Sequence, residues 1–535
     1  MQTRKHLFPL LLAMSILLAF SACRPKAAHD NESEQPAFAW RGVMFDVSRH
    51  FFDAGYIKKQ IDVLSGYGIN TLHLHLTDAA GWRLEIKAYP RLTQYAAWRT
   101  APDWKTWWNG DRGYMEEGAD GAYGGYFTQE QMRDLVAYAA ERGITIVPEI
   151  EMPGHSEEVD AAYPEYALHK GETVAHLDSL CTFYENVLTE VLDIFPSPFI
   201  HIGGDECDYV LQGDLIRHMA EWLTAHGRRA IGWDEVLRPD LPKDVVIMVW
   251  HGMDKAREAI SQGHDVILSP GAWCYLDQYQ DAMWAQPEAI GGYCPLEKVC
   301  EFQPLAGLTE REIPHVLGLQ GNEWAEYIGT PEHHEEMLYP RIIALAEIGQ
   351  KGAIDDVKAF RRRAVKEVRK LRKAGINAFN LDHEVGQRPE SLRPTHHMAE
   401  GCAVSYGYPF SPYYPADGDI SLTDGLRGGW HHGDGRWQGF IGRGVDFNVD
   451  FYEQRHVNTV SIDFFNSPGV EIFLPSEITV NGLQPDNDPL NGVDTDGYAI
   501  VTYHFTLNAD MDKFNLHATP NAAGGWLFTD EVVVE

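Results

Sequence analysis

Two adjacent carboxylates, Asp205 and Glu206, directly follow a pair of glycines at the end of a short apolar run. The run, residues 199–202, has the composition of a buried strand, and the glycines allow the backbone to turn sharply or a ligand to approach it closely. Paired carboxylates at the carboxyl end of a strand are suited to acid–base chemistry in α/β enzymes. A solvated Asp-Glu pair is the ordinary alternative, but the surrounding His-x-Gly-Gly-Asp-Glu sequence favours a functional site.

Several other predicted strands end in an aromatic residue beside a carboxylate. Aromatic rings stack on the apolar faces of sugar rings, and carboxylates accept hydrogen bonds from sugar hydroxyls, so this combination predicts a pocket for a neutral sugar. Taken singly, a tryptophan is more often part of the core, and only the repetition of the pattern argues for a site. The residues concerned are Trp233 with Asp234, Trp250, Tyr275 with Asp277, and Trp324 with Glu326.

A metal site is a second interpretation of the polar residues near the second and third predicted strands. Three histidines with carboxylates form a plausible zinc ligand set. However, the sequence contains no His-Glu-x-x-His, and a His-x-His strand also fits structural pairing with acids. We therefore predict no metal in this region, whose candidate ligands are His73, His75, Asp78, Glu151 and His155.

Apolar runs of strand length alternate with amphipathic helical stretches from residue 40 to residue 352. Eight such units fit a (β/α)8 barrel better than an open sheet, and a barrel carries its active site at the carboxyl ends of its strands. The predicted strands are residues 42–47, 71–76, 144–150, 199–202, 229–232, 245–250, 265–268 and 316–320.

Two further regions follow the predicted barrel. Residues 353–395 are predicted as a helical linker. Its basic stretch, 358–373, is interpreted as a solvated helix face, because the chain as a whole carries a net charge of −34. Residues 396–535 show period-two alternation between turns rich in Gly, Asp, Asn and Pro, which is typical of an antiparallel β-sandwich. The predicted fold class is therefore α/β, a TIM barrel followed by a sandwich.

The first residues have the layout of an export signal, predicted to occupy residues 1–23. Arg4 and Lys5 precede an apolar run, residues 7–20, that is too short to span a bilayer. Ser-Ala-Cys at 21–23 resembles the end of a bacterial lipoprotein signal, which predicts acylation of Cys23. Residues 24–39 then form a polar tether. We expect an exported, lipid-anchored protein of the bacterial cell envelope; plain cleavage and secretion is the alternative.

The strongly acidic composition argues against nucleic acid or an anionic membrane surface as a partner, so the lipid anchor is the expected membrane contact. Six cysteines remain besides Cys23, without a Cys-x-x-Cys pair, which disfavours a zinc or redox site. Cys294 and Cys300 could pair in an exported protein. No feature of the sequence predicts an oligomeric state.

Residues 41 to about 350 resemble the catalytic barrel of glycoside hydrolase family 20, the β-N-acetylhexosaminidases. The resemblance implies removal of terminal β-linked GlcNAc or GalNAc from N-acetylhexosamine-containing glycans, without a cofactor. The matching motifs follow the family's order along the whole barrel: Arg-Gly-Val-Met-Phe-Asp-Val-Ser-Arg-His-Phe (41–51), His-Leu-His-Leu-Thr-Asp (73–78), Gly-Trp-Arg (81–83), Pro-Glu-Ile-Glu-Met-Pro-Gly-His-Ser (148–156), His-Ile-Gly-Gly-Asp-Glu (201–206), Trp-Cys-Tyr-Leu-Asp (273–277) and Trp-Ala-Glu (324–326).

In that family the substrate's own 2-acetamido oxygen is the nucleophile. The resemblance implies that Glu206 is first the acid and then the base, with a pKa held up by aromatic surroundings. It also implies that Asp205 stays ionised and orients the acetamide N–H, and that Tyr275 holds the acetamide oxygen. The remaining implied roles are walls for Trp233, Trp250 and Trp324, hydroxyl binding for Arg41, Asp277 and Glu326, and support of the acid pair for Asp78 and His155.

The chain departs from the family pattern at several points. The small α/β domain that usually precedes the barrel is missing, the loop at 157–177 looks short, and Ala79 and Glu151 stand where Asp is common. These departures leave the preference for the leaving group open. Two other functions remain alternatives: a non-catalytic glycan-binding surface protein and a disaccharide-releasing relative. Retention of the acid, its neighbour and Tyr275 disfavours the first, since a binding protein needs no acid.

The C-terminal region resembles galactose-binding-like (F5/8 type C) modules. The resemblance rests on Leu-Thr-Asp-Gly (422–425), Trp-Gln-Gly-Phe (437–440) and Trp-Leu-Phe-Thr-Asp-Glu (526–531). Such modules often bind glycans, sometimes with a structural calcium ion, and a module that only packs on the barrel is the alternative.

Overall fold

The computed structural model describes residues 35–166, 174–207, 212–486 and 488–535. The predicted signal (1–23), acylated Cys23, most of the tether and part of the 157–177 loop lie outside these residues. Within them, no helix is both long and apolar enough to cross a bilayer. Cys294 and Cys300 are free thiols, so the pairing left open by their spacing is not formed.

Eight parallel strands close into a barrel, in the order β1-β12-β11-β10-β9-β8-β7-β2. This arrangement confirms the predicted TIM barrel. The strands are almost entirely buried, as expected when helices cover a parallel sheet. They are β1 (Trp40–Asp46), β2 (Thr71–His75), β7 (Thr145–Glu149), β8 (Phe199–His201), β9 (Arg229–Trp233), β10 (Val246–Val249), β11 (Val266–Leu268) and β12 (Val316–Glu323).

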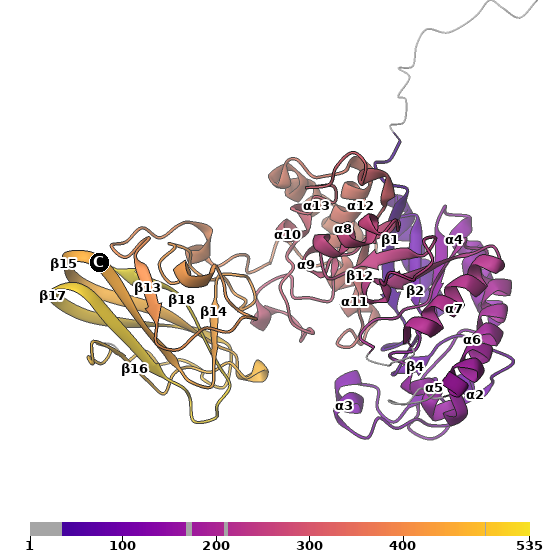
Figure 1. Cartoon of the computed structure of the whole chain (residues 1–535), viewed down its shortest axis with the longest axis horizontal. Coiled ribbons are helices and arrows are strands. Elements are labelled where there is room, and N and C mark those ends of the chain that lie inside the picture. The colour runs from indigo at the N-terminus through magenta and orange to yellow at the C-terminus, as the bar shows by residue number, and fades with distance from the viewer. Residues whose placement is uncertain (1–34, 167–173, 208–211, 487) are drawn as a thin grey trace, which may run out of the picture. The chain divides into compact units, whose positions relative to one another are not determined.

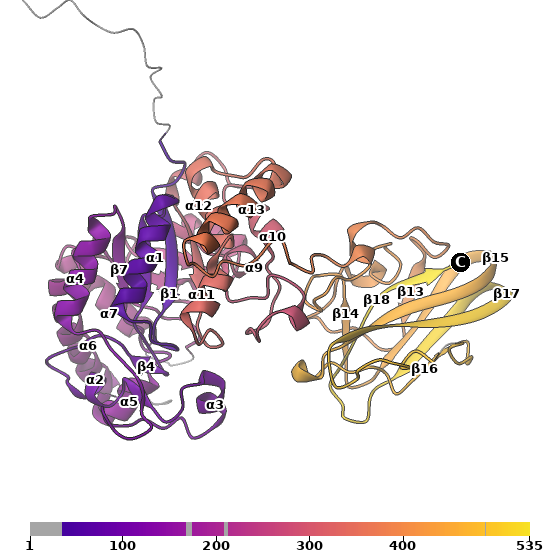
Figure 2. The same ribbon diagram turned by 180° about the vertical axis from the view of Figure 1, so that it is seen from behind.

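Helices surround the barrel on its outside (Figures 1 and 2). Several begin at a side-chain cap: Asp53 accepts a hydrogen bond from Tyr56 N, and Thr128 forms a capping box with Gln131. The helices are α1 (Ala54–Gly66), α2 (Arg91–Gln94), α3 (Trp104–Asn109), α4 (Gln129–Ala140), α5 (Glu157–Ala162), α6 (Val174–Ile194), α7 (Gln212–Ala225), α8 (Met253–Ser261), α9 (Gly271–Cys274), α10 (Leu296–Cys300), α11 (Pro331–Leu338) and α12 (Arg341–Lys351).

Short strand pairs decorate the loops that follow β2, where β3 (Thr77–Asp78) pairs with β4 (Gly81–Trp82) and β5 (Trp98–Arg99) pairs with β6 (Tyr123–Gly124). Arg83 is fully buried beneath these loops and donates hydrogen bonds to backbone carbonyls, including those of Ala97 (2.6 Å) and Gly125 (3.1 Å). One buried guanidinium therefore satisfies carbonyl groups that would otherwise be desolvated without a partner.

Helix α13 (Val357–Lys373) follows the barrel and carries the basic stretch. Its buried residues, Phe360, Ala364, Val368 and Leu371, recur at helical spacing and form one face. The basic residues lie on the other face, where several pair with acids; Arg363, for example, contacts Glu347 at 2.6 Å. The helix is thus an ordinary amphipathic surface element, in line with its interpretation as a solvated face.

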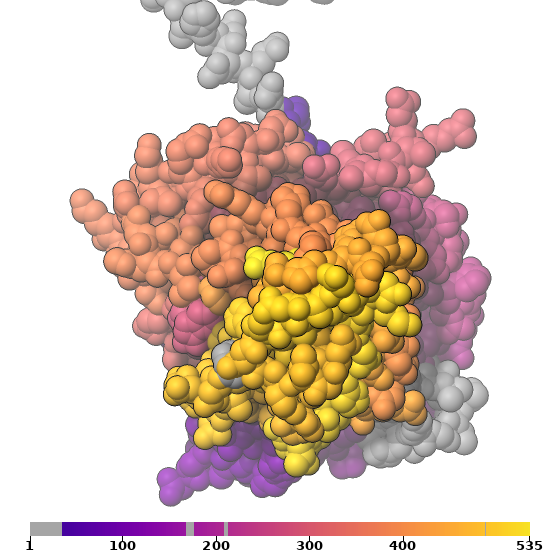
Figure 3. Space-filling view, turned by 90° about the vertical axis from the view of Figure 1, so that its left-hand side faces the viewer, coloured from indigo at the N-terminus to yellow at the C-terminus, as the bar shows by residue number. Residues whose placement is uncertain are grey.

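The C-terminal region is an antiparallel sheet in the order β14-β18-β15-β17-β16, with β13 paired to β15. Apolar residues alternate inward along its strands, as the period-two pattern predicts. Two strands are unusually long, at 22 and 21 residues. The strands are β13 (Ala403–Tyr406), β14 (Gln438–Ile441), β15 (Val445–Asn466), β16 (Glu477–Val480), β17 (Ala499–Thr519) and β18 (Trp526–Val534). In Figure 3 this region, orange to yellow, presents one continuous surface.

Candidate active site

A cavity of about 320 Å³ lies where the barrel strands end. It is lined by most of the residues selected from the sequence, by Arg49, and by four residues from the loop after β11. The lining residues are Arg49, His155, Asp205, Glu206, Trp233, Trp250, Tyr275, Asp277, Gln278, Ile290, Gly291, Gly292, Trp324 and Glu326.

The two glycines before the acid pair are needed for steric reasons. Gly203 (φ 60°) and Gly204 (φ 92°) both have left-handed backbone conformations that disfavour other residues. A Cβ atom at Gly203 would overlap the carboxyl group of Glu151, and one at Gly204 would overlap Val236. The turn therefore brings Asp205 and Glu206 to the cavity while Glu151 packs directly beneath the backbone.

His155 connects the acid pair to a buried carboxylate. Its Nε2 lies 3.3 Å from Glu206 Oε2 and 3.7 Å from Asp205 Oδ2, and its Nδ1 lies 3.5 Å from Asp78 Oδ2. Burial opposes the charge on the imidazole, but the surrounding carboxylates, Asp78 first, raise the pKa of His155 to about 10. The ring is therefore an imidazolium at neutral pH.

Glu206 differs from its predicted state. The side chain is 62% exposed and faces His155 instead of lying among the rings, so the hydrogen bond from His155 lowers the pKa of Glu206 below its ordinary value. The predicted raised pKa of Glu206 is therefore wrong, because the hydrogen bond from the imidazolium outweighs partial burial. For Asp205, burial raises the pKa and His155 opposes the rise.

Arg49 is a second cation of the cavity, beside His155, and the sequence analysis did not select it. Its guanidinium contacts Asp78 (2.8 Å), Asp46 (3.2 Å) and Glu326 (3.8 Å), and lies 5.0 Å from the ring centroid of Trp324. These carboxylates raise the pKa of Arg49 well above its usual value despite complete burial. The sequence could have identified Arg49 as a cavity residue from its position, because it follows the carboxyl end of β1 at Asp46 by three residues.

Arg41 was predicted to bind sugar hydroxyls, and the structure contradicts this. It lies near the amino end of β1, where its guanidinium donates to Gly68 O and Phe38 O, both at 2.7 Å. Five residues separate Arg41 from Asp46 at the carboxyl end, which places it roughly 16 Å away along the strand. Arg41 therefore cannot reach the cavity.

Two of the three tryptophan walls are held by acids, Trp233 by the buried Glu149 and Trp250 by the partly buried Glu235. Trp233 Nε1 donates to Glu149 Oε1 (2.8 Å), and Trp250 Nε1 donates to Glu235 Oε2 (3.0 Å). The rings of Trp250 and Tyr275 stack with centroids 6.1 Å apart. Because each indole N–H is anchored behind the ring, the apolar faces are free to line the cavity.

Two carboxyl groups, Asp277 and Glu326, lie at one side of the cavity. Burial, reinforced by the neighbouring Glu326, raises the pKa of Asp277 to about 8, and burial also raises the pKa of Glu326. A neutral Asp277 can both donate and accept a hydrogen bond. This side of the cavity is therefore suited to hydroxyl groups.

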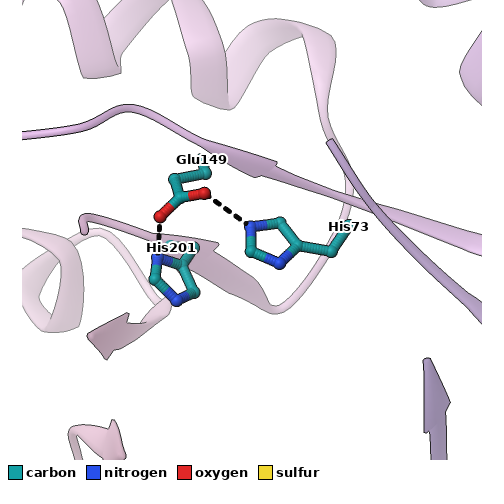
Figure 4. Close-up of side chains that lie close together, drawn as sticks. All are labelled: His73, Glu149 and His201. Atoms are coloured by element: carbon teal, nitrogen blue, oxygen red, sulfur yellow. Dashed lines mark ion pairs between the residues drawn. The ribbon is translucent and has the colours of Figure 1, made fainter. Parts of the chain in front are cut away.

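Beneath Trp233, the buried carboxylate of Glu149 on β7 gathers histidines from two other strands, β2 and β8 (Figure 4). Its oxygens lie 2.9 Å from His201 Nδ1 and 3.1 Å from His73 Nε2, and it also contacts His75. The other nitrogen of His73 lies 3.0 Å from Gln320 Nε2. Both Glu149 oxygens already accept hydrogen bonds, and one binds Trp233, so this cluster fits a hydrogen-bond centre better than a metal ligand set.

His155 should give the protein a distinctive pH dependence of stability. Its folded pKa of about 10 exceeds the unfolded value of 6.5, so its contribution is fully present below pH 6.5 and is lost as pH rises toward 10. The melting-temperature difference between the wild type and His155→Gln should therefore be largest near pH 6 and shrink toward pH 10. A difference that is constant over this range would contradict the assigned charge.

Comparison with known proteins agrees with this geometry. The sequence profile "Glycosyl hydrolase family 20, catalytic domain" matches residues 38–210 and 209–352, more than half of the chain. The "Beta-hexosaminidase" of Porphyromonas gingivalis is 39% identical over 356 residues, covering 59% of this chain and 43% of that protein. The "Beta-hexosaminidase" of Akkermansia muciniphila is 30% identical over 405 residues, covering 67% and 77%.

Solved structures are also similar. A GH20 exo-β-N-acetylglucosaminidase from Vibrio harveyi in complex with N-acetylglucosamine matches with a TM-score of 0.56 and 31% identity, covering 64% of this chain and 59% of that chain. The chain thus spans less than two thirds of the length of the P. gingivalis and V. harveyi proteins.

Proposed function

Since the chain belongs to glycosyl hydrolase family 20, we propose that it is an exo-β-N-acetylhexosaminidase that removes terminal, non-reducing β-linked GlcNAc or GalNAc. One observation carries the proposal: Asp205, Glu206 and Tyr275 meet in a single cavity walled by three tryptophans. The relatives named β-hexosaminidase and the V. harveyi complex with N-acetylglucosamine support the same substrate class.

In the proposed reaction the nucleophile belongs to the substrate. Asp205 accepts the acetamide N–H and Tyr275 donates to the acetamide oxygen, which attacks the anomeric carbon as the glycosidic C–O bond breaks. Glu206 gives its proton to the leaving oxygen, and the resulting carboxylate then takes a proton from the water that opens the oxazolinium ring.

Substrate binding must change the protonation of Glu206. This side chain is mostly exposed and lies beside an imidazolium, which favours the carboxylate. A bound sugar and its leaving group displace water from the carboxylate, and desolvation raises a carboxyl pKa. We propose that Glu206 takes up its proton with the substrate.

The remaining cavity residues bind the sugar. We assign hydroxyl binding to Arg49, Asp277 and Glu326, with Arg49 replacing Arg41 in this role. Trp233, Trp250 and Trp324 enclose the acetamide and the ring, while Asp78 holds His155 and Arg49 in place.

Hydrolysis of a chromogenic β-N-acetylglucosaminide tests the proposal. The folded protein should release the chromophore with GlcNAc as the sugar product. Binding of the same compound without turnover would support a non-catalytic glycan-binding protein instead. Release of a disaccharide, and not of the monosaccharide, from a longer glycan would assign the chain to disaccharide-releasing enzymes.

Arg49 should be essential for affinity, and Arg41 should not. Arg49→Met leaves three carboxylates without their shared cation, and truncating one partner of a buried charge pair costs about 2–5 kcal/mol. We expect kcat/KM to fall roughly 10²-fold, mainly through KM. Arg41→Gln is the matched control, because it removes an arginine near the opposite end of β1. An equal fall in kcat/KM in the two variants would contradict the assignment of hydroxyl binding to Arg49 in place of Arg41.

We also propose that the protein is exported and lipid-anchored through Cys23 to the bacterial cell envelope. The support is the signal-like sequence before Cys23. Cys23→Ser should move the protein from the membrane fraction to the soluble fraction of the producing cells. An unchanged distribution would favour plain cleavage and secretion.

The C-terminal sheet is proposed to be a galactose-binding-like module that holds a structural calcium ion. Asp424 and Glu531 lie together, and Glu531 Oε2 is buried without a hydrogen-bond donor. Burial, with the nearby Glu531, raises the pKa of Asp424 to about 6. His397 Nε2 lies 2.6 Å from Glu531 Oε1, so Oε2 and the Asp424 carboxyl group are left to share either a proton or a cation, and a carboxylate pair suits calcium.

Calcium binding at this pair has a direct test. Calcium should raise the melting temperature relative to EDTA, and Asp424→Asn should abolish that increase. An identical melting temperature with calcium and with EDTA would assign a shared proton to the pair.

A further inference from the structure

Glu151 occupies an unusual position directly below the acid pair. It lies two residues beyond β7 and is fully buried. Its Oε1 accepts hydrogen bonds from Gly204 N (2.9 Å) and Met152 N (3.0 Å), and its Oε2 lies against Gly203. The carboxyl group is thus fixed against the backbone that carries Asp205.

The carboxyl groups of Glu151 and Asp205 lie within hydrogen-bond reach of each other, and each has one buried oxygen without a donor. Glu151 Oε2 and Asp205 Oδ1 are both inaccessible to solvent, and neither receives a hydrogen bond from a nitrogen or hydroxyl donor. An ionised carboxylate has only acceptors, so two ionised groups here would repel and remain unsatisfied. Leaving such atoms unpaired is costly, whereas one proton between them satisfies both.

We propose that Glu151 is a neutral carboxylic acid whose Oε2–H donates to Asp205 Oδ1, which makes it a positioning residue for the acid pair. Its role in turnover rests on the proposed function, but its protonation does not. The bond fixes Oδ1 and leaves Oδ2, on the His155 side, as the oxygen of Asp205 that can accept the acetamide N–H.

The charges around Glu151 favour this state. Asp205 faces it from the loop after β8, Glu149 lies on its own strand, and Tyr184 faces it from α6. The strongest charges acting on Glu151 are those of the carboxylates Asp205 and Glu149, whereas His155 and His75 act on Asp205. Burial first, then these two carboxylates, raise the pKa of Glu151 well above its ordinary value.

Turnover provides the first test. Glu151→Met keeps the volume and removes the donor, and should lower kcat roughly 10- to 100-fold with a smaller change in KM. Glu151→Gln reproduces a protonated carboxyl group, with one acceptor for Gly204 N and one donor for Asp205, and should recover most of that loss. Glu158→Met is the matched control, since Glu158 is an equally buried carboxyl outside the cavity, and kcat should not change. Equal losses in Glu151→Gln and Glu151→Met would overturn the proposal.

Stability provides a test that does not need activity. A folded Glu151 that keeps its proton while the unfolded chain ionises above pH 4.5 makes the wild type less stable as pH rises. Glu151→Gln has no such proton, so its melting temperature should rise relative to the wild type between pH 4.5 and 8. A difference that stays constant would show an ionised Glu151 and overturn the proposal. If this melting-temperature difference rises with pH but the wild type hydrolyses no substrate, the proposed function is refuted and the protonated state of Glu151 stands.

Discussion

Replacing Glu206 with glutamine should lower kcat by about 10²–10⁴-fold for substrates with unactivated leaving groups. The amide cannot supply a proton to the departing oxygen, and it cannot later accept one from water. Because Glu206 is mostly solvent-exposed in the free protein and holds no buried element, the variant should fold and melt like the wild type. Steady-state hydrolysis of an alkyl or disaccharide β-N-acetylglucosaminide measures the effect.

The leaving group provides the control for this experiment. A nitrophenolate needs little protonation as it departs. The rate of bond breaking for a nitrophenyl substrate should therefore fall much less in Glu206→Gln than the rate for an alkyl substrate. Equal losses for aryl and alkyl leaving groups would mean that Glu206 does not act as the general acid. The neighbouring His155, which lies 3.3 Å away, would then become the group to test.

Removing the acetamide from the substrate should abolish turnover. In the proposed mechanism a 2-hydroxyl analogue has no oxygen that can reach the anomeric carbon, and the cavity offers Asp205 only as a partner for the N–H. We expect hydrolysis of the 2-hydroxyl glycoside to fall to background while the N-acetyl compound is turned over. Both compounds should carry the same chromophore and be compared at equal enzyme concentration.

The two outcomes of this substrate experiment separate two mechanisms. Comparable rates on both substrates would mean that a protein carboxylate forms the bond to the sugar, as in two-carboxylate retaining enzymes. The proton shared by Glu151 and Asp205 argues against that result. It occupies Oδ1 of Asp205, so only Oδ2 remains, and Oδ2 accepts the acetamide N–H instead of attacking the sugar.

The barrel was predictable from the sequence because its strands are continuous apolar runs, each ending in polar residues. The positions of Trp233 and Trp324 followed from the same rule, since each lies where its strand ends. Two arginines, Arg41 within β1 and Arg49 in the turn that follows it, show the limit of this rule. Arg41 and Arg49 lie eight residues apart around one strand, and only the strand's exact end decides which of them meets the cavity.

The state of Glu206 could not be predicted for a different reason. Glu206 and His155 both have left-handed backbones, with φ values of 47° and 48°, and these conformations bring an imidazolium to the carboxylate. Neither conformation has a signature in the residue types. The same holds for the long strands β15 and β17, because the register shift near Asp450 has no signature in the residue types.

The contacts of Glu149 imply that this active site will be hard to alter one residue at a time. From Glu149 the chain of contacts runs through His75, Asp78 and His155 to Glu206, with carboxylates and imidazoles alternating. Groups coupled in this way titrate collectively, and the effects of replacing them do not add. Losses from single replacements along the chain should therefore overlap. Engineering a new pH optimum would require changing two neighbouring members together so that the alternation of charge is kept.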